Sequence, residues 1–311
     1  MKDPHLGCAE ISLSRMGLGS WPFGGGYDWG PCDESAAQRT IEFALEQGIN
    51  WVDTAPVYGD GQSEKLLGRV LSGRRQEVLL AGKCGLIKDG SWTNHDLHPA
   101  SIRQQLEGSL LRLKTDYLDL YQIHYPDPQV PLENAMEELL RLHKEGKIRA
   151  IGLCNVNEQQ IRLACGVTPI FSAQNEYSLL HPMAGEKVLE VCQELGVRFI
   201  GYGVLSGGIL SGKYKTAPNL RRADARNYFY KCYRGNAFLE AQQTVTRLKT
   251  LAKQKNSVPS AVALAWALAK PAVSGILVGS RSEDQLRQNL MALQLHLAPE
   301  EISFLEGKLC E

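Results

Sequence analysis

Four polar side chains lie at or near the ends of apolar segments and are of the types that transfer protons. Asp53, Lys83 and His124 each close an apolar segment, and Tyr58 follows Asp53 by five residues. A tyrosine hydroxyl ordinarily titrates at about 10, so it works as a general acid at neutral pH only where something favours its anion. The side chains of Lys83 and His124 are the candidate positive charges. The spacing predicts a proton-transfer site, provided that the three segments are neighbouring strands.

The elements that must position these side chains alternate along the chain as predicted strands and helices. We expect strands over 16–19, 49–53, 78–83, 118–123, 148–154, 170–174, 197–202 and 275–278. Helices are expected over 33–48, 64–71, 99–113, 132–145, 157–165, 183–195, 238–253 and 259–269, with a last helix after Ser282. Eight strand-then-helix units predict the α/β class and favour a closed (α/β)8 TIM barrel. Reactive groups of such barrels lie at the carboxyl ends of strands, where Asp53, Lys83 and His124 fall.

Two long loops and one helix start complete this outline. The loops cover about 84–98 and 203–237, and no low-complexity linker divides the chain, so we expect a single barrel domain over 1–311. Ser282 to Gln285 has the form of a capping box, in which Gln285 caps the last helix. The glycines of 17–26 lack the Gly-x-Gly-x-x-Gly spacing before a helix, so they do not predict a Rossmann fold.

The composition argues against a nucleic-acid-binding, secreted or membrane protein. Lys+Arg and Asp+Glu both total 34, so the formal net charge is zero and nucleic acid is a poor candidate partner. The eight cysteines are scattered without a Cys-x-x-Cys pair, which is typical of reduced thiols in a cytoplasmic protein. No apolar run has membrane length, and the start lacks the apolar core of a signal peptide. His95, Asp96 and His98 fit an ordinary polar loop, and we assign no metal.

Three motifs resemble the aldo-keto reductase family. The first runs from Asp53-Thr54-Ala55 through Tyr58-Gly59 to Gly68, the second ends at His124 after 116–123, and the third covers 146–155 with Asn155 at its end. The resemblance spans nearly the whole chain. It implies an (α/β)8 barrel that reduces a small-molecule carbonyl substrate with NADPH, and it identifies no protein partner.

The resemblance also implies roles for individual residues. Tyr58 matches the proton donor, Lys83 and Asp53 match its charged support, and His124 matches the group that orients the substrate. The implied cofactor contacts are Asn155 and Gln174 on the nicotinamide carboxamide, Tyr202 stacked on its ring, Leu205, Ser206, Gly208, Gly212 and Lys213 on the pyrophosphate, Gly279, Ser280, Arg281, Gln285 and Asn289 on the adenosine 2′-phosphate and adenine, and Trp21. Gln285 thus has two interpretations, as a helix cap and as an adenine contact.

The chemistry of these residue types fits carbonyl reduction. A cation within about 4 to 6 Å typically lowers a tyrosine pKa by roughly 1 to 3 units, so Lys83 is expected to ease proton release from Tyr58. Asp53 is expected to keep that lysine charged in a partly buried site. A fork-shaped donor such as Arg281 suits a phosphate oxygen, which favours NADPH over NADH.

The sequence gives only candidate residues for the substrate pocket and leaves two interpretations of the thiols and of the direction of the reaction. Candidate walls of the substrate pocket are Trp21, Phe23, Trp92 and Tyr125. Cys154 stands where serine is usual in the family, and Val204 where many members have proline. Cys84 and Cys154 have two interpretations, as redox-sensitive thiols and as buried packing. Two alternative functions remain: a regulatory subunit that binds the cofactor and senses redox state, and an alcohol or polyol dehydrogenase working in the oxidative direction.

Overall fold

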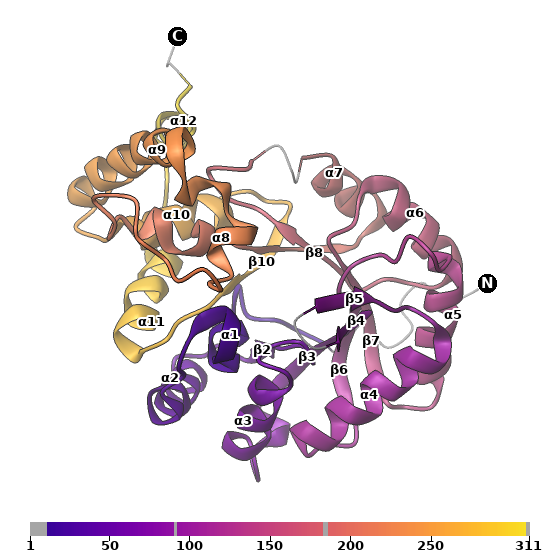
Figure 1. The fold of residues 1–311 in the computed structure, drawn as a ribbon. Helices are drawn as coiled ribbons and strands as arrows, with labels where there is room; N and C mark the ends of the chain where they lie inside the picture. The colour runs from indigo at the N-terminus through magenta and orange to yellow at the C-terminus, as the bar shows by residue number, and fades with distance from the viewer. Residues whose placement is uncertain (1–10, 90–91, 183–185, 309–311) are drawn as a thin grey trace.

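The strands of the computed structural model close into one parallel barrel (Figure 1). The structure describes residues 11–89, 92–182 and 186–308. The eight strands follow the order β1-β10-β9-β8-β7-β6-β3-β2, and β2 pairs again with β1. They are β1 (Met16–Gly19), β2 (Trp51–Asp53), β3 (Leu79–Cys84), β6 (Leu118–Ile123), β7 (Ile148–Cys154), β8 (Ser172–Glu176), β9 (Arg198–Tyr202) and β10 (Val273–Val278). The predicted (α/β)8 TIM barrel is confirmed.

Helices form an outer layer around these strands (Figure 1). They are α2 (Glu34–Glu46), α3 (Gln62–Val70), α4 (Pro99–Leu113), α5 (Leu132–Lys144), α6 (Glu158–Val167), α7 (Glu186–Leu195), α9 (Gly235–Gln254), α10 (Pro259–Leu268), α11 (Glu283–Leu290) and α12 (Pro299–Glu306). Asp33 caps α2, since its side chain accepts a hydrogen bond from Ala36 N at 3.0 Å, and Pro99 begins α4. None of the helices in the described ranges is both long enough and apolar enough to cross a bilayer.

Closing the barrel buries both faces of each strand. Inside the barrel, Trp51, Leu120 and Phe171 pack together, all at most 2% exposed. The next residues of β6, Tyr121 and Ile123, point outward into the larger core between strands and helices. This alternation follows from the period of two along a strand. It explains why the strands are nearly continuous apolar runs, which the sequence shows clearly.

The predicted loop at 84–98 is wrong in part, because it contains a β-hairpin. Strands β4 (Leu86–Asp89) and β5 (Trp92–His95) pair antiparallel, with Lys88 opposite Thr93. Each strand has only four residues, too few for a clear periodicity in the sequence. The hairpin projects from the carboxyl end of β3, the end at which Lys83 lies.

Other differences lie in loops and at the end of the chain. The segment 203–237 contains the 3₁₀ segments η4 (Ser206–Ser211) and η5 (Lys231–Tyr233) and the short helix α8 (Arg226–Phe229). The predicted glycine-rich loop likewise contains η2 (Trp21–Gly24) and α1 (Gly26–Trp29). Helix α12 was not predicted. The predicted start at 183 of the sixth predicted helix lies outside the described residues, and the helix, α7, is described from Glu186.

A buried carboxylate organises the opposite, amino-terminal end of the barrel. Asp119, near the start of β6, is 1% exposed. It accepts hydrogen bonds from Arg75 Nη2 at 2.8 Å, from Arg149 Nη1 at 3.1 Å and from Leu80 N at 2.9 Å. Both guanidinium groups also lie over the Tyr117 ring, at 4.2 and 3.9 Å from its centroid. This cluster joins β3, β6 and β7 far from the carboxyl ends of the strands.

We expect Asp119→Asn to lower the free energy of unfolding by about 3 kcal/mol, because a neutral amide cannot balance the guanidinium groups. Urea denaturation measures the loss. The matched control is Glu194→Gln, which breaks the exposed pair between Glu194 and Arg162 and should leave stability unchanged. Equal stability of the wild type and Asp119→Asn would contradict this account of the barrel base.

Candidate active site

The carboxyl ends of β2, β3 and β6 bring the four predicted catalytic side chains together. Lys83 Nζ donates hydrogen bonds to Asp53 Oδ1 and to Tyr58 Oη, the second at 3.1 Å. The rings of Tyr58 and His124 meet edge to face at 5.8 Å between centroids. The strand register produces this arrangement, since Asp53 pairs with Ala81 and Lys83 with Gln122. Lys83 is therefore a bridge between a carboxylate and a phenol.

The turn that carries Tyr58 is fixed by a close approach of two backbone segments. Gly59 has a φ of +60°, and a Cβ placed there would lie 1.9 Å from the carbonyl oxygen of Gly24. Ser20 N and Ser20 Oγ both donate to Asp53 O, at 2.9 and 2.7 Å. The segment after β1 is thereby held against the Tyr58 turn, and the Trp21 ring stacks on Tyr58 at 5.9 Å.

Asp53 has further partners that the sequence analysis missed. Its Oδ2 accepts hydrogen bonds from Gln122 Nε2 at 3.2 Å and from Gln174 Nε2 at 3.0 Å. Gln122 is fully buried and lies on β6, two residues before His124. The sequence could have indicated Gln122, because residues two apart on a strand face the same side and Gln122 is two residues from His124.

Burial and charge act against each other on Lys83 and Tyr58. Burial lowers the pKa of Lys83, but its interactions with Asp53, first, and with Tyr58 outweigh burial, and the net pKa lies above the ordinary value. The prediction that Asp53 keeps Lys83 charged agrees with this direction. For Tyr58, burial raises the pKa and the ammonium of Lys83 lowers it, with burial the larger effect. The expected lowering by Lys83 is present, but burial outweighs it, so the net pKa of Tyr58 lies above its ordinary value and the phenol is protonated at neutral pH.

His124 is held in its neutral form. Burial is the main cause of a pKa well below the ordinary value, and the nearby positive charges of Lys83 and His95 lower it further. Its ring stacks on Tyr125 at 5.4 Å between centroids. A neutral imidazole carries one N–H, so His124 offers a single hydrogen-bond donor at this edge of the site.

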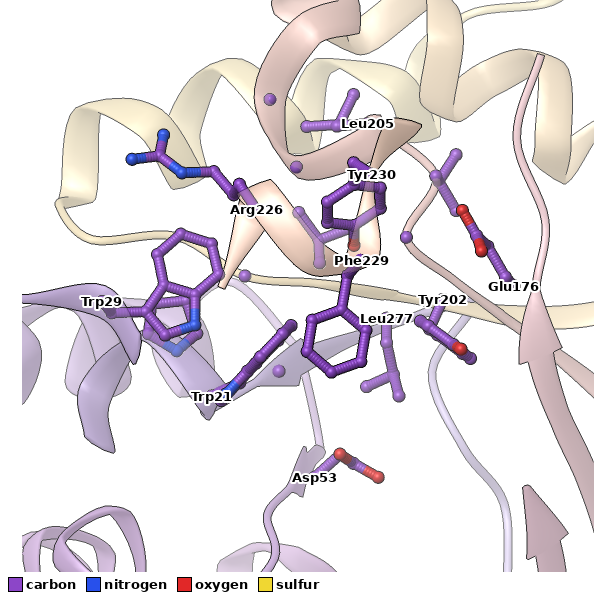
Figure 2. A pocket seen from close by; sticks show the side chains of 18 of the residues that line it. Trp21, Trp29, Asp53, Glu176, Tyr202, Leu205, Arg226, Phe229, Tyr230 and Leu277 are labelled. Atoms are coloured by element: carbon purple, nitrogen blue, oxygen red, sulfur yellow. The ribbon is translucent and has the colours of Figure 1, made fainter. Parts of the chain in front are cut away.

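Asp53, Tyr58 and His124 form the floor of a cavity of 610 Å³, and Lys83 lies buried behind them. Figure 2 shows Trp21, Trp29 and Phe229 gathered on one side, Tyr202 and Glu176 on the other, and Asp53 below. The indole of Trp21 meets Trp29 and Phe229 edge to face, at 5.3 and 5.1 Å between centroids. A cavity of this size, with an aromatic wall and a polar floor, is typical of a small-molecule or cofactor site.

Two predicted pocket walls lie elsewhere. Phe23 is 3% exposed and packs in the core between strands and helices. In a 3₁₀ turn successive side chains point about 120° apart, so Trp21 and Phe23 do not face the same cavity. Trp92 is 77% exposed on β5, whereas its neighbour Thr93 lines the cavity. Adjacent residues of a strand point to opposite faces, which explains the difference. Trp21 and Tyr125 do line the cavity.

Most of the predicted cofactor contacts also line this cavity. They are Trp21, Asn155, Gln174, Tyr202, Leu205, Gly208, Lys213, Gly279, Arg281, Gln285 and Asn289. Ser206, Gly212 and Ser280 lie behind that wall. Ser206 Oγ lies 3.1 Å from Ser178 Oγ, and Ser280 Oγ accepts a hydrogen bond from Asn289 Nδ2 at 3.1 Å. These serines support the lining residues instead of facing the cavity.

The capping interpretation of Gln285 is correct in part. Ser282 Oγ accepts a hydrogen bond from Gln285 N at 3.3 Å, as in a capping box. The Gln285 side chain, however, accepts from Arg281 N at 3.0 Å and not from Ser282 N. Gln285 therefore fixes the backbone beside Arg281 while its side chain also reaches the cavity wall.

The donor set fits a dinucleotide along this cavity. Asn155 and Tyr202 lie on one wall and are joined by a hydrogen bond of 2.7 Å from Tyr202 Oη to Asn155 Oδ1. Gly207 and Gly208 line the cavity, so the backbone of η4 borders it there without side chains, and a Cβ on Gly207 would lie 2.8 Å from the Tyr230 ring. Lys213 lines the same end, where its ammonium suits a phosphate.

The segment 203–237 contributes cavity residues that sequence analysis missed. Arg226 pairs with both carboxylate oxygens of Asp224, at 2.8 and 2.7 Å, and donates to Tyr214 Oη at 2.8 Å. It thereby holds Phe229 and Tyr230 over the cavity (Figure 2). The only signal in the sequence was the aromatic run around these two residues.

Both cysteines beside the site are buried. Burial raises the pKa of Cys84 to about 12, and burial likewise raises the pKa of Cys154. Their exposed fractions are 1% and 0%. An inaccessible protonated thiol reacts slowly with oxidants, so the packing interpretation agrees with the structure.

Sequence and structure comparisons give a consistent result. The model of the Aldo/keto reductase family matches residues 15–309. Aldo-keto reductase YhdN of Bacillus subtilis is 39% identical over 294 residues, covering 92% of this chain and 87% of that protein. NADH-specific methylglyoxal reductase of Escherichia coli is 34% identical over 313 residues, covering 96% and 95%. The solved glycerol dehydrogenase AKR11B4 from Gluconobacter oxydans has a TM-score of 0.87 at 32% identity, covering 96% of this chain and 92% of that one.

The neutral state of His124 predicts a pH-dependent stability. A histidine in the unfolded chain titrates at about 6.5 and binds a proton below that pH, whereas folded His124 resists protonation. The stability of the wild type should therefore fall, relative to His124→Asn, as the pH is lowered from about 8 to about 5. Urea denaturation at both pH values measures the difference. His98→Asn, which changes an exposed histidine, is the control, and parallel pH curves for wild type and His124→Asn would contradict the prediction.

Proposed function

The chain belongs to the aldo/keto reductase family, and we propose that it reduces an aldehyde or ketone to an alcohol with NADPH, using Tyr58 as the proton donor. Members of this family are oxidoreductases that act on carbonyl and alcohol groups with a nicotinamide cofactor, so the reaction class follows from membership. The identity of the proton donor and the choice of NADPH are the parts that we propose.

One observation carries the proposal. Lys83 Nζ lies between Asp53 and Tyr58 Oη, 3.1 Å from the phenol, directly behind the floor that Asp53 and Tyr58 give to a 610 Å³ cavity. A phenol that is protonated at neutral pH can give up a proton, and an adjacent ammonium stabilises the phenolate that remains. The arrangement therefore suits a step in which negative charge develops on a substrate oxygen beside Tyr58.

Each of the other side chains supports that step. When bound, the nicotinamide supplies the hydride that goes to the carbonyl carbon. Tyr58 Oη donates its proton to the carbonyl oxygen, and Lys83 stabilises the phenolate that results. Neutral His124 offers its N–H to the same oxygen and orients the carbonyl. Asp53 keeps Lys83 charged throughout.

The residues that would hold the cofactor lie along the carboxyl ends of β7 to β10. Asn155 and Gln174 would bind the carboxamide, and the Tyr202 ring would stack on the nicotinamide. The loop from Leu205 to Lys213 would cover the pyrophosphate. Loops after the last two barrel strands commonly bind phosphate, which supports this orientation.

Arg281 is the basis for preferring NADPH. It lines the cavity beside the start of α11, and its Nη2 donates to Pro31 O at 2.6 Å, which fixes the side chain. A fixed guanidinium is suited to a 2′-phosphate. One relative is named an NADH-specific methylglyoxal reductase, so family membership does not decide between the two cofactors.

We expect Tyr58→Phe to lower kcat for an activated aldehyde such as a nitrobenzaldehyde by about 10² to 10⁴, because general acid catalysis contributes a factor of that order. The Kd for NADPH should stay unchanged, since the ring remains. Turnover is measured as the loss of the reduced cofactor's absorbance during NADPH oxidation.

Tyr228→Phe is the matched control for this experiment, because Tyr228 is 66% exposed and does not line the cavity. It should retain wild-type kcat. Full activity of Tyr58→Phe would refute the role of Tyr58. Absence of turnover by the wild type over a broad carbonyl panel, together with a stable copurifying protein, would favour the regulatory alternative.

We expect Arg281→Met to raise the KM for NADPH by about tenfold and to leave the KM for NADH nearly unchanged, because only NADPH carries the phosphate that Arg281 would bind. Methionine keeps the apolar stem of the side chain. Steady-state kinetics with each cofactor measure both constants. Arg287→Met on the adjoining helix α11 is the control, because Arg287 does not line the cavity. Equal effects of Arg281→Met on both cofactors would contradict the proposed contact.

A further inference from the structure

The carboxylate of Asp53 is held by more than its ion pair. One oxygen bonds to Lys83, and the other accepts hydrogen bonds from the side-chain amides of Gln122 and Gln174, at 3.2 and 3.0 Å. All four side chains are buried, none more than 4% exposed. Because a buried carboxylate without donors is costly, the two amides stabilise a charge that the ion pair alone leaves half satisfied.

The charge of Asp53 dictates how both amides are turned. An ionised carboxylate only accepts hydrogen bonds, so each amide must present its nitrogen to it. The oxygen of Gln122 is then turned away, where it accepts from Gln174 Nε2 at 3.2 Å and from Cys154 Sγ at 3.6 Å. The orientation of each amide thus follows from the partners on every side and not from a choice between equivalent rotamers.

A consequence appears on the cavity side of Gln174. The Gln174 nitrogen donates to Asp53 and to Gln122. The Gln174 oxygen is therefore the side-chain atom that can still form a hydrogen bond, and Gln174 lines the cavity. No hydrogen bond to this oxygen occurs within the described ranges of the chain. The network therefore presents an acceptor, and not a donor, to whatever occupies the cavity.

We propose that Gln122 is a positioning residue that couples the proton donor to the cofactor site: it fixes Asp53 so that Lys83 stays beside Tyr58, and it locks the amide of Gln174 with its oxygen toward the cavity. That oxygen accepts a hydrogen bond from an amide N–H, such as the carboxamide of nicotinamide. The inference rests on the proposed function.

The effect on proton transfer has a defined sign. The titratable groups around Gln122 are Asp53, Lys83, Tyr58 and the thiols of Cys84 and Cys154. Without the Gln122 amide, Asp53 has one donor fewer and attracts the ammonium of Lys83 more strongly. Lys83 then stabilises the Tyr58 anion less, so the phenol releases its proton at higher pH.

Gln122→Met tests the coupling, because methionine has a similar length and volume and makes no hydrogen bond. We expect kcat to fall by about tenfold, the basic limb of the kcat against pH profile to move to higher pH, and the Kd for NADPH to rise by about tenfold. Equilibrium titration of cofactor fluorescence measures the Kd without turnover. Wild-type values of all three quantities would overturn the inference.

The control is Asn50→Leu, at the opposite end of the barrel before β2. Asn50 accepts from Ser14 N at 2.8 Å and donates to Ser12 O at 2.7 Å, so its loss also removes two hydrogen bonds of a side-chain amide. It should lower stability without moving the pH profile or the Kd. Equal shifts in Asn50→Leu and Gln122→Met would mean that Gln122 acts only through stability, and would overturn the inference.

Gln122→Glu provides a second, independent readout, which also serves if Gln122→Met does not fold. In its protonated form the new carboxyl donates to Asp53 as the amide does, whereas in its ionised form it repels Asp53. Activity and NADPH affinity should therefore approach wild type at low pH and fall as the pH rises. A pH-independent loss of both would overturn the inference.

The two proposals fail in different ways. A wild-type protein that turns over no carbonyl refutes the proposed function, while the Kd of the variants still tests the role of Gln122. A wild-type protein that is active, with an equally active Gln122→Met variant, refutes the role of Gln122 and leaves the proposed function intact.

Discussion

The buried ion pair between Lys83 and Asp53 is the constraint on which the rest of the site depends. Lys83 is 1% exposed, and an ammonium so deeply buried stays charged only with a partner that is itself well satisfied. Such a pair contributes little to stability compared with apolar packing, because both charges must leave water. Its value is chemical, since the charge that Asp53 holds on Lys83 acts on the hydroxyl of Tyr58, 3.1 Å away.

A second buried carboxylate shows why location matters. Asp119 at the base of the barrel is paired with Arg75 and Arg149, whose side chains are 16% and 51% exposed. Water solvates part of the guanidinium charge there, and the cluster links β3, β6 and β7. At the other end Asp53 is enclosed by Lys83 and two amides, and none of the arginines in the described part of the chain pairs with it. An aspartate thus stabilises the fold at one end of the strands, and at the other end an aspartate sets the charge of Lys83.

The cavity combines distant parts of the chain. Its floor comes from Asp53 at the end of β2, from Tyr58 in the turn after it and from His124 after β6, whereas the residues suited to a cofactor come from the ends of β7 to β10 and the segment after β9. Trp21, near the start, meets Phe229 from that segment at 5.1 Å (Figure 2). Arg226, fixed by Asp224, holds this contact in place. The Gln122 and Gln174 amides join the two halves beneath the cavity, so the proposed cofactor contacts and the proposed proton donor share one polar network.

The sequence by itself determined the barrel and the positions of Asp53, Lys83 and His124 at strand ends, because strand periodicity, helix periodicity and caps are local and repeat eight times. The tertiary structure alone decided where side chains point and how their charges add. It turned Phe23 into the core and Trp92 toward solvent, folded 84–98 into a hairpin, and added α12. It also made burial outweigh Lys83 in setting the Tyr58 pKa, and placed Gln122 against Asp53. These outcomes depend on contacts between residues far apart in the chain, and local periodicity carries no information about them.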